Sequence, residues 1–468
     1  MIPERAREVA ALTSELAGVF ESAGKHIYLV GGVVRDLVLG RFPDGGATGR
    51  PGEPPALPDL DFTTDALPEE TEAILSPWAE KVWSQGKAFG TLGAWKKGRR
   101  YEITTHRGES YSDISRKPEV RYSMSLEDDL SRRDFTVNAM ALTLPGFELI
   151  DPFGGLDDLA ASRLATPGSP EQSFSDDPLR MLRAARFSAG YGLQPDEALV
   201  DAVRRLRRRL DIVSRERIRD ELDKLLVVER PSPGLRFLVE TGLAELFLPE
   251  LPALALEQDP VHQHKDVLAH TFAVVDKASR DRLLRLAALF HDVGKPATRS
   301  FARDGVSFHH HDVVGAKLTR RRMRELRYGE EDVRVVSELV RLHLRFHTYR
   351  FGWTDAAVRR YVRDAGPLLQ RLNELTRCDC TTRNPDKARS LNRRIDALEL
   401  RIVELRTQEA LDSIRPDLDG NEVMEHLGIG PGPLVGKALA FLLDLRMDEG
   451  PHPKEEALRR LGKWWEEQ

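Results

Sequence analysis

Two short stretches decide the fold of the first part of the chain: Leu-Val-Gly-Gly-Val-Val-Arg-Asp at residues 29–36 and Asp-Leu-Asp at residues 59–61. The apolar run ending in Gly-Gly predicts a strand that leads into a helix, where glycines let backbone N–H groups approach a phosphate. Asp59 and Asp61 are two residues apart in a strand-like run, so their carboxylates share one face. Because neighbouring carboxylates repel unless a cation lies between them, we expect Mg²⁺ and phosphoryl or nucleotidyl transfer.

Length and composition limit the possibilities. A chain of 468 residues is too long for one hydrophobic core and suggests about three domains. The formal net charge is −5, so a nucleic-acid surface must come from local arginine clusters. Such clusters occur at 204–209, 320–324 and 359–360, where they line a groove for a polyanion or form solvated helix faces. Two cysteines and no run of about 18 apolar residues predict a cytoplasmic protein with no membrane partner.

Strand patterns are confined to the first third of the chain. Residues 3–23 predict a helix, followed by strands at 27–30, 60–63, 88–96, 100–105 and 147–150 and a helix at 68–76, an α/β unit of about 150 residues. From residue 157 onward helical periodicity predominates, with helices expected at 180–189, 197–210, 216–226 and 234–241. Pro249, Pro252 and Pro260 indicate a boundary before further helical blocks.

Two further motifs contain groups suited to phosphate chemistry. Glu102 lies between residues that favour burial, and is either a third carboxylate beside the metal or an exposed strand residue. The block at 127–139, Glu-Asp-Asp-Leu-Ser-Arg-Arg-Asp-Phe-Thr-Val-Asn-Ala, contains an arginine pair suited to bidentate phosphate contacts.

Together with Asp-Pro-Phe-Gly-Gly at 151–155 and Asp-Pro-Leu-Arg-Met-Leu-Arg-Ala-Ala-Arg-Phe at 177–187, these motifs occur in one order along the chain. This order resembles the class II tRNA nucleotidyltransferase (CCA-adding) and bacterial poly(A) polymerase family. The resemblance implies an α+β multidomain fold, with a polymerase-β-like palm followed by helical neck, body and tail regions. We expect the palm at 1–155, the neck at 156–255, an HD domain at 256–385 and a tRNA-contacting tail at 386–468.

The resemblance also implies roles for single residues. Asp59 and Asp61 would bind the catalytic Mg²⁺ ions of a two-metal nucleotidyl transfer. The residues expected to contact the nucleotide phosphates or sugar are Gly31, Gly32, Arg35 and Arg133.

Asp177 and Arg180 match the protein template that the family uses to select the incoming base, and Arg183 would join the same site. At i and i+3 we expect them on one helix face, where the carboxylate accepts from an amino group and the guanidinium donates to a ring nitrogen. Cytosine and adenine both present that pair of groups, whereas uracil and guanine do not. Apart from the resemblance, the pair is an ordinary helix ion pair. The family commonly has Glu just before this Asp, and here it is Asp176.

A second set of residues lies in the helical part. His270, the adjacent His291 and Asp292, and Asp379 further along resemble the HD phosphohydrolase superfamily. Imidazole and carboxylate ligands suit a second divalent metal, which would activate attack on a phosphate. The alternative is an HD fold without activity. Which of His309, His310, His311 and His343 is a further ligand stays open.

We therefore expect a Mg²⁺-dependent enzyme that adds C, C and A to tRNA 3′ ends from CTP and ATP. The alternatives are a partial (CC- or A-adding) enzyme, a poly(A) polymerase, an HD phosphohydrolase with a nucleotide-sensing N-terminal domain, and a non-catalytic RNA-binding protein. The family places a flexible loop for the switch from CTP to ATP at the polar connector 107–128, which argues against a CC-only enzyme. The sequence does not fix the oligomeric state.

Overall fold

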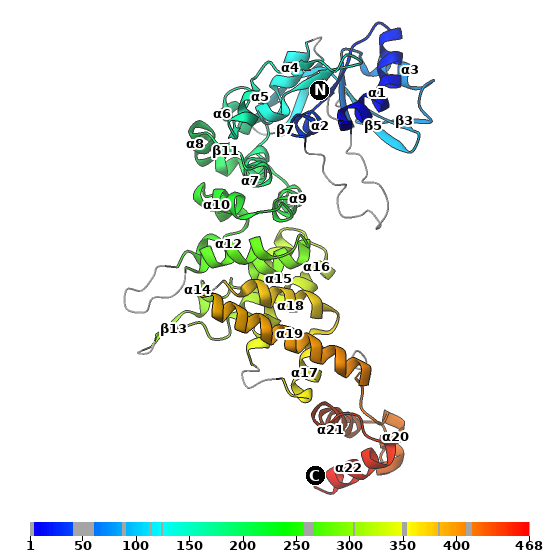
Figure 1. Ribbon diagram of the computed structural model, residues 1–468, viewed down its shortest axis with the longest axis vertical. Helices are drawn as coiled ribbons and strands as arrows, with labels where there is room; N and C mark the ends of the chain where they lie inside the picture. The colour runs from blue at the N-terminus through cyan, green and yellow to red at the C-terminus, as the bar shows by residue number, and fades with distance from the viewer. Residues whose placement is uncertain are drawn as a thin grey trace. The chain divides into compact units, whose positions relative to one another are not determined.

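The computed structural model describes residues 4–40, 60–86, 90–112, 115–122, 125–256, 266–302, 305–348, 353–381, 384–408 and 414–467. The chain divides into two compact units, Met1–Phe247 and Leu248–Gln468, labelled along the chain in Figure 1.

A seven-stranded mixed sheet lies at the centre of the N-terminal unit, with the strand order β3-β4-β5-β2-β1-β8-β9. β2 and β5 run parallel, and the other neighbouring strands are antiparallel. The strands are β1 (Ile27–Val30), β2 (Leu60–Thr64), β3 (Lys81–Gly86), β4 (Thr91–Lys96), β5 (Arg99–Thr105), β8 (Ala141–Thr143) and β9 (Leu149–Ile150).

Helices α1 (Glu4–Ser22) and α3 (Pro68–Leu75) cover one face of this sheet (Figure 1). On that face the rings of Tyr101 and Trp78 meet edge to face, with centroids 5.1 Å apart. Side chains alternate along a strand, so Arg100 and Glu102 on β5 leave by the opposite face. We call this opposite face the open face. α4 (Leu126–Ser131) covers its β1 and β8 side through a small apolar cluster that includes Val30 and Leu130.

The rest of the N-terminal unit is mainly helical. α7 packs against α9 and α10, and the contact with α10 is close because a Cβ on Gly234 would lie 2.4 Å from the backbone oxygen of Ala185. The helices are α2 (Gly32–Val38), η2 (Thr136–Asn138), α5 (Gly155–Ala160), α6 (Pro170–Asp176), α7 (Arg180–Tyr191), α8 (Glu197–Leu206), η3 (Arg207–Ile212), α9 (Arg215–Leu226), α10 (Ser232–Glu240) and α11 (Ala244–Phe247).

In the C-terminal unit, α13 is buried along its length and is surrounded by α12, α16 and α18. The helices up to α19 are η4 (Pro252–Leu254), α12 (Val267–Lys277), α13 (Arg282–Phe290), α14 (Lys295–Thr298), α15 (His311–Glu325), α16 (Glu330–Leu342), η5 (Arg345–Thr348), α17 (Asp355–Ala365), η6 (Gly366–Leu368), α18 (Leu369–Asp379) and α19 (Pro385–Gln408). A separate apolar cluster joins α20 (Gly420–Leu427), α21 (Pro433–Glu449) and α22 (Lys454–Glu466).

The α+β fold expected from the sequence is confirmed, and several local expectations are corrected. The expected connector 107–128 contains a hairpin, β6 (Arg107–Ser112) with β7 (Ser115–Tyr122). β3 and β8 were missed, and short strands do occur after residue 157, although no strand was expected there: β10 (Arg163–Leu164), β11 (Gln194–Pro195), β12 (Ser300–Ala302) and β13 (Gly305–Ser307). Strands of two or three residues are too short to show a hydrophobic period, so their pairing depends on tertiary contacts. The four-domain division stays a prediction.

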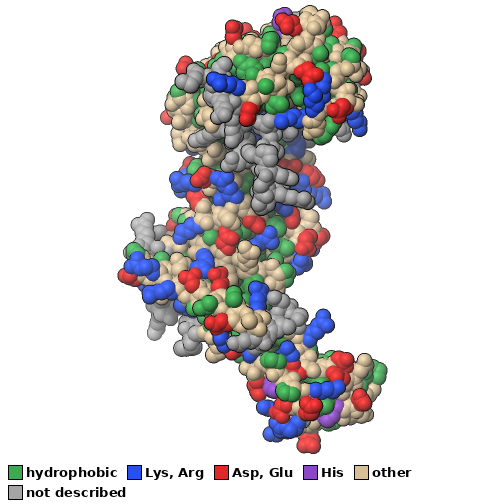
Figure 2. Space-filling model, turned by 45° about the vertical axis from the view of Figure 1, so that its right-hand side comes forward, with side chains coloured by type: hydrophobic (Ala, Val, Ile, Leu, Met, Phe, Trp, Pro, Cys, Tyr) green, Lys and Arg blue, Asp and Glu red, His purple; other side chains and the backbone are tan. Residues whose placement is uncertain are grey.

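Among the described helices, none combines the length and apolar character needed to cross a membrane. On the face drawn in Figure 2, Lys and Arg side chains are interspersed with Asp and Glu side chains on both units. This mixture agrees with the small net charge of −5.

Candidate active site and metal centre

Two carboxylates lie side by side on the open face of the sheet. Asp61 on β2 and Glu102 on β5 are partners in the register of two parallel strands, so both side chains leave the same face. Asp61 is exposed, and Glu102, which is 39% exposed, forms an ion pair with Arg100. Asp59, the other expected metal ligand, lies outside the described residues. Two neighbouring carboxylates that both reach solvent suit a shared cation.

Gly31 is the point on which Asp61 and Arg133 converge. A Cβ built on Gly31 would lie 3.0 Å from Nη1 of Arg133 and 3.9 Å from Oδ2 of Asp61. Gly31 also has a φ of +80°, a conformation that favours glycine. The next residue, Gly32, begins α2, and a Cβ there would lie 3.3 Å from Nη2 of Arg35. The glycine pair thus lets two guanidinium groups approach the backbone beside the carboxylates.

Arg133 is anchored at one end of its guanidinium. Its Nη2 donates to Oδ2 of Asp129 over 3.3 Å, and Arg132 also donates to Asp129. Burial alone would raise the pKa of Asp129, but the charges of Arg132 and Arg133 outweigh it and hold the pKa below its ordinary value. Within the described part of the chain, Nε of Arg133 is buried without a hydrogen-bond partner. A cationic donor left unpartnered beside a carboxylate pair suits an anionic ligand such as a phosphate.

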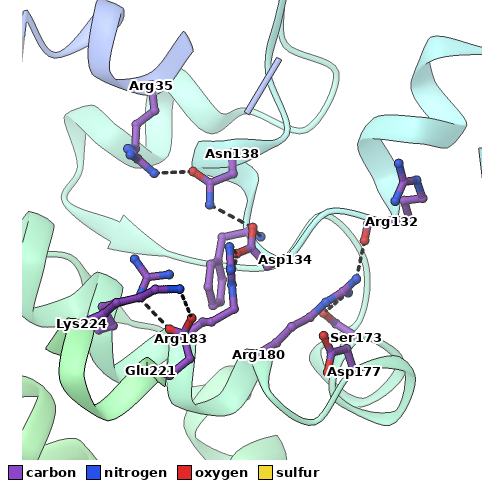
Figure 3. Close-up of polar contacts among 12 residues, drawn as sticks. Arg35, Arg132, Asp134, Asn138, Ser173, Asp177, Arg180, Arg183, Glu221 and Lys224 are labelled. Carbon is purple, nitrogen blue, oxygen red and sulfur yellow. Dashed lines mark hydrogen bonds and ion pairs between the residues drawn. The ribbon is translucent and has the colours of Figure 1, made fainter. Parts of the chain in front are cut away.

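Asp134 is the centre of a buried polar network that joins α2, η2 and α7 (Figure 3). Its Oδ1 accepts from Nδ2 of Asn138 at 2.9 Å, and its Oδ2 accepts from Nε of Arg183 at 2.7 Å. Asn138 in turn accepts from Nη1 of Arg35 at 2.5 Å. Burial opposes the charged form of Asp134, but the Arg183 charge and the hydrogen bonds from Asn138 and Arg183 lower its pKa to about 2.

Arg35 is held within the protein. Its side chain is 5% exposed, and the guanidinium carbon lies 3.9 Å from the ring centroid of Tyr191, whose hydroxyl it also contacts. Because Tyr191 is the last residue of α7, Arg35 connects the end of that helix to α2. These contacts give Arg35 a positioning function in this structure. Its expected contact with a nucleotide stays a prediction.

The expectation that Asp177 and Arg180 share one helix is wrong. α6 ends at Asp176, Asp177 is extended with φ −134° and ψ 99°, and α7 begins at Arg180. The reason is Pro178, because a proline disfavours the helical conformation of the residue before it. Asp177 pairs with Arg217 at 3.3 Å, so the alternative of a helix ion pair with Arg180 is also corrected.

Arg180 is fixed by two other groups (Figure 3). Its Nη1 donates to Oγ of Ser173 at 2.8 Å, and its Nη2 donates to the backbone oxygen of Arg132 at 2.5 Å. The side chain is therefore oriented next to the Arg132-Arg133 pair. Two of the five donors of the guanidinium are used, so donors remain for a ligand.

In the C-terminal unit, the four expected HD residues come together. Nε2 of His270 lies 2.9 Å from Oδ1 of Asp379 and 3.6 Å from Oδ2 of Asp292. Nε2 of His291 lies 3.2 Å from the same Oδ2 of Asp292. Lys295 also contacts that oxygen, at 2.6 Å. The pKa of Asp292 is held well below its ordinary value, because the charges of His291 and Lys295 outweigh the effect of burial.

His311 and His343 complete the cluster, which answers a question that the sequence left open. Asp292, His311 and His343 form a second group with metal-ligand spacing, and it shares Asp292 with the group of His270 and His291. Nε2 of His311 lies 3.2 Å from Nε2 of His343 and 3.5 Å from Oδ1 of Asp292. The neighbouring His309 and His310 are exposed.

The histidine hydrogen bonds favour the protonation state that binds a metal. Nδ1 of His291, His311 and His343 each contacts a backbone carbonyl, at 2.7, 2.7 and 2.6 Å. A carbonyl only accepts, so each Nδ1 carries a proton and each Nε2 faces the cluster, where a neutral ring offers a lone pair to a metal. The neighbouring Asp292 and Asp379 outweigh burial and raise the pKa of His291. Burial, with the charge of His291, lowers the pKa of His343 to about 4, which keeps that ring neutral. Facing lone pairs of this kind suit a cation between them.

Known protein families match three parts of the chain. Residues 27–165 match the family described as Poly A polymerase head domain, residues 192–254 match the Probable RNA and SrmB- binding site of polymerase A, and residues 267–403 match the HD domain. The A-adding tRNA nucleotidyltransferase of Deinococcus radiodurans is 37% identical over 358 residues, which are 73% of this chain and 80% of that protein. The chain belongs to the tRNA nucleotidyltransferase family.

Membership of the tRNA nucleotidyltransferase family confirms the resemblance and makes the protein an enzyme. The CCA-adding enzyme of Leuconostoc citreum is 39% identical over 224 residues, 48% of this chain and 51% of that protein. The chain therefore aligns with about half the length of that relative. The structure of the Bacillus stearothermophilus CCA-adding enzyme in complex with CTP covers 96% of this chain and 97% of its own, with 23% identity and a TM-score of 0.64, and shows the same fold.

Within this family member, most of the arginine clusters are engaged by the protein itself. In the first cluster, Arg209 donates to the backbone oxygen of Ser175 at 2.8 Å, and Arg205 pairs with Glu171. In the second, Arg322 pairs with Glu250 at 2.8 Å. These contacts favour the interpretation as paired and solvated helix faces for those arginines. An RNA contact by the clusters stays a prediction.

Proposed function

We propose that this nucleotidyltransferase adds C, C and A to the 3′ end of tRNA, taking CTP and ATP as substrates and Mg²⁺ as the metal. The observation that supports this most is the convergence of Asp61 and Arg133 at Gly31, with Glu102 beside Asp61 in the strand register. It provides metal-binding carboxylates and a phosphate-binding cation at one point. The names of the relatives agree with this activity. The two free cysteines agree with a cytoplasmic location.

Each residue has a defined task in this proposal. Asp61 and Glu102, with Asp59, would hold the metal, which supplies activation of the RNA 3′-hydroxyl and charge stabilisation on the α-phosphate. Arg133 binds the triphosphate through its unpartnered Nε. Asp177 accepts from the amino group of the base, and Arg180, oriented by Ser173 and the Arg132 backbone, donates to the ring nitrogen.

The test uses purified protein with tRNA transcripts that end before CCA, after C, after CC and after CCA. CTP and ATP are supplied singly and together. We expect extension of the first three transcripts to CCA and no extension of the last. Failure to extend any end would overturn the proposal, whereas repeated addition of A to an unrelated RNA would indicate a poly(A) polymerase. The exposed Asp211 supplies a matched control, because D211N keeps the active site while D61N removes one of its carboxylates.

Addition of A alone is the second candidate. The observation that favours it is the name of the Deinococcus radiodurans relative, whose alignment covers 80% of its own length, more than that of the Leuconostoc citreum CCA-adding enzyme. The same transcripts separate the two candidates. An A-adding enzyme extends the CC end with ATP and leaves the shorter ends unextended with CTP.

We also propose that the C-terminal unit binds divalent metal through His270, His291, Asp292, His311, His343 and Asp379 and hydrolyses a phosphate ester. The support is the set of four imidazoles whose Nε2 atoms meet at Asp292, with Asp379 beside His270. When bound, a divalent metal supplies Lewis-acid activation of the phosphate. The ammonium group of Lys295 contacts Oδ2 of Asp292 and is suited to bind a phosphate oxygen at the same place.

The metal content of the purified protein and its hydrolysis of 2′,3′-cyclic AMP test this second activity. We expect H291A to lose bound metal and hydrolysis, and H309A, which changes an exposed neighbour, to retain both. Equal metal content in the wild type and H291A would exclude the centre. Bound metal without hydrolysis in the wild type would leave a structural metal site and remove the phosphohydrolase function.

A further inference from the structure

Two tryptophans lie on the outer strands of the open face, beside the carboxylates. Trp83 is on β3 and Trp95 is on β4, and Trp95 is 42% exposed. Together with Lys81 and Arg100 they line a surface pocket of about 710 Å³. We call these four residues the tryptophan platform. An exposed tryptophan beside a half-buried one, with two cations, is unusual for a surface without a ligand.

The strand register makes the platform continuous with the carboxylates. Asp61 pairs with Glu102, Glu102 pairs with Gly93, and Gly93 pairs with Trp83, so these residues form one row across four strands. The adjacent row consists of Arg100, Trp95 and Lys81. Residues paired across neighbouring strands share a face, and each strand adds about 4.8 Å, which places the Trp83 backbone about 10 Å from that of Glu102.

The indole of Trp83 is held by the strand beside it. A Cβ on Gly93 would lie 2.2 Å from a carbon of the Trp83 indole, so the ring packs over the backbone at a position that has no side chain. The guanidinium carbon of Arg100 lies 5.7 Å from the Trp83 ring centroid, and Arg100 also pairs with Glu102. By contrast, Trp78 on the opposite face is 8% exposed and packs on Tyr101 in the core. Trp83 and Trp95 are therefore not core residues.

The platform and the triphosphate groups lie on opposite sides of the carboxylates. Gly31 and Arg133 approach Asp61 from the β1 side, whereas the platform extends through β5, β4 and β3. A nucleotidyl transfer needs two substrates at the metal, the nucleoside triphosphate and the RNA end. The groups on the β1 side suit the triphosphate, which leaves the RNA end to be placed. Flat aromatic rings stack on unpaired bases, and Lys and Arg neutralise the phosphates between them. These properties match a single-stranded nucleic acid end.

We propose that the tryptophan platform binds the single-stranded 3′ end of the RNA substrate and directs its terminal hydroxyl towards Asp61 and Glu102. Unpaired bases stack on Trp83 and Trp95, and Lys81 and Arg100 contact the intervening phosphates. This inference rests on the proposed nucleotidyl transfer at the same site. It goes further by assigning the path of the RNA end to β3, β4 and β5.

The test compares two tRNA transcripts, one ending in CC and one trimmed to the last acceptor base pair so that it has no single-stranded end. Stacking on an aromatic ring predicts that W83A and W95A each weaken binding of the CC transcript by about 5- to 150-fold. Binding of the trimmed transcript should be unchanged. With the CC transcript the KM for tRNA should rise, whereas the KM for ATP should keep its value. W83F should restore most of the affinity.

Two further variants test the geometry and the charge. G93A should displace the indole and weaken binding of the CC transcript as W83A does. K81A should reduce the slope of log Kd against log salt by about 0.7, the value for one phosphate contact on a single strand. The control K97A changes a lysine that pairs with Glu15 instead, and should leave the slope unchanged.

The outcomes separate this inference from the proposed function. If W83A and W95A lose equal affinity for both transcripts, or if only the KM for ATP rises, the assignment of the RNA end to the platform would be overturned. Unchanged Kd in W83A, W95A and G93A would do the same. If the wild type extends no transcript, the proposed function fails, and the Kd comparison still decides whether the platform binds a single-stranded end.

Discussion

The D134N variant removes the charge at the centre of the network in Figure 3 at nearly unchanged volume. Asp134 is 8% exposed and binds Arg183 of α7 through Oδ2. In D134N the Arg183 guanidinium, whose side chain is 32% exposed, loses its carboxylate, and a half-buried charge without its partner is destabilising. We therefore expect D134N to fold but to open around α7 more readily. The same opening would misplace Arg180, which lies on the same helix.

The magnitude follows from the pKa of Asp134. Its fall from 3.8 to about 2 is about 1.8 units, which corresponds to about 2.4 kcal/mol of stability at pH 7. Because the folded-state pKa is depressed, this stability is present above the unfolded pKa of 3.8 and is lost as the pH falls towards 2. About half of it remains at pH 3. The difference in the free energy of unfolding between wild type and D134N should therefore become smaller as the pH falls from 3.8 towards 2.

Hydrogen exchange of peptides from α7, followed by mass spectrometry, measures this difference. A loss of about 2.4 kcal/mol accelerates exchange about 60-fold at pH 7. The ratio of wild-type to D134N protection cancels the intrinsic rates and should fall with pH. D201N is the matched control, because its ion pair with Arg204 spans 3.2 Å between side chains that are 57% and 52% exposed. Equal acceleration in both variants, or none in D134N, would refute the reasoning.

Three further predictions concern the two sites. D61N should abolish nucleotide incorporation and change tRNA binding less than about twofold, because one carboxylate is lost from the metal site while the RNA surface is retained, as filter binding would show. R180A should loosen the preference for CTP and ATP over UTP and GTP by about 10- to 100-fold, measured by single-nucleotide incorporation, and an unchanged preference would contradict the base-selecting role. Chelation should lower the melting temperature of the wild type and leave that of H291A unchanged, measured by calorimetry, because a metal that binds the folded state stabilises it.

Much of the site could be predicted from the sequence, because its residues are close to one another in local motifs. Gly31, the carboxylates at 59–61 and the arginine pair at 132–133 each follow from a short pattern with a physical reason. The prediction that the four HD residues His270, His291, Asp292 and Asp379 come together is also confirmed, whereas their role as metal ligands stays a prediction. In these cases one local feature, such as a strand ending in glycine or a histidine that ends a helix, carries the information.

Other features depended on contacts between distant segments. His311 and His343 could not be selected from four histidines, because the deciding contact joins residues 32 positions apart. The ion pair between Asp134 and Arg183 spans 49 positions, and that between Asp177 and Arg217 spans 40. A local pattern cannot show which partner a charged side chain selects, since several cations lie within reach along the chain. The break at Pro178 is a local signal, whereas the contacts that orient Arg180 come from the packing of α7.

By itself, the sequence predicted the α+β fold, the order of the motifs and the residues suited to contacts with phosphate, metal and base. The tertiary structure decided which of those motifs lie together. The strand register aligns Asp61 with Glu102 and continues to Trp83, and the helix packing brings two histidine groups onto Asp292. The physical reason is that a periodic pattern fixes the face of an element, whereas register and packing fix which faces meet. In this protein the strand register places carboxylates, cations and aromatic rings from separate segments on one surface.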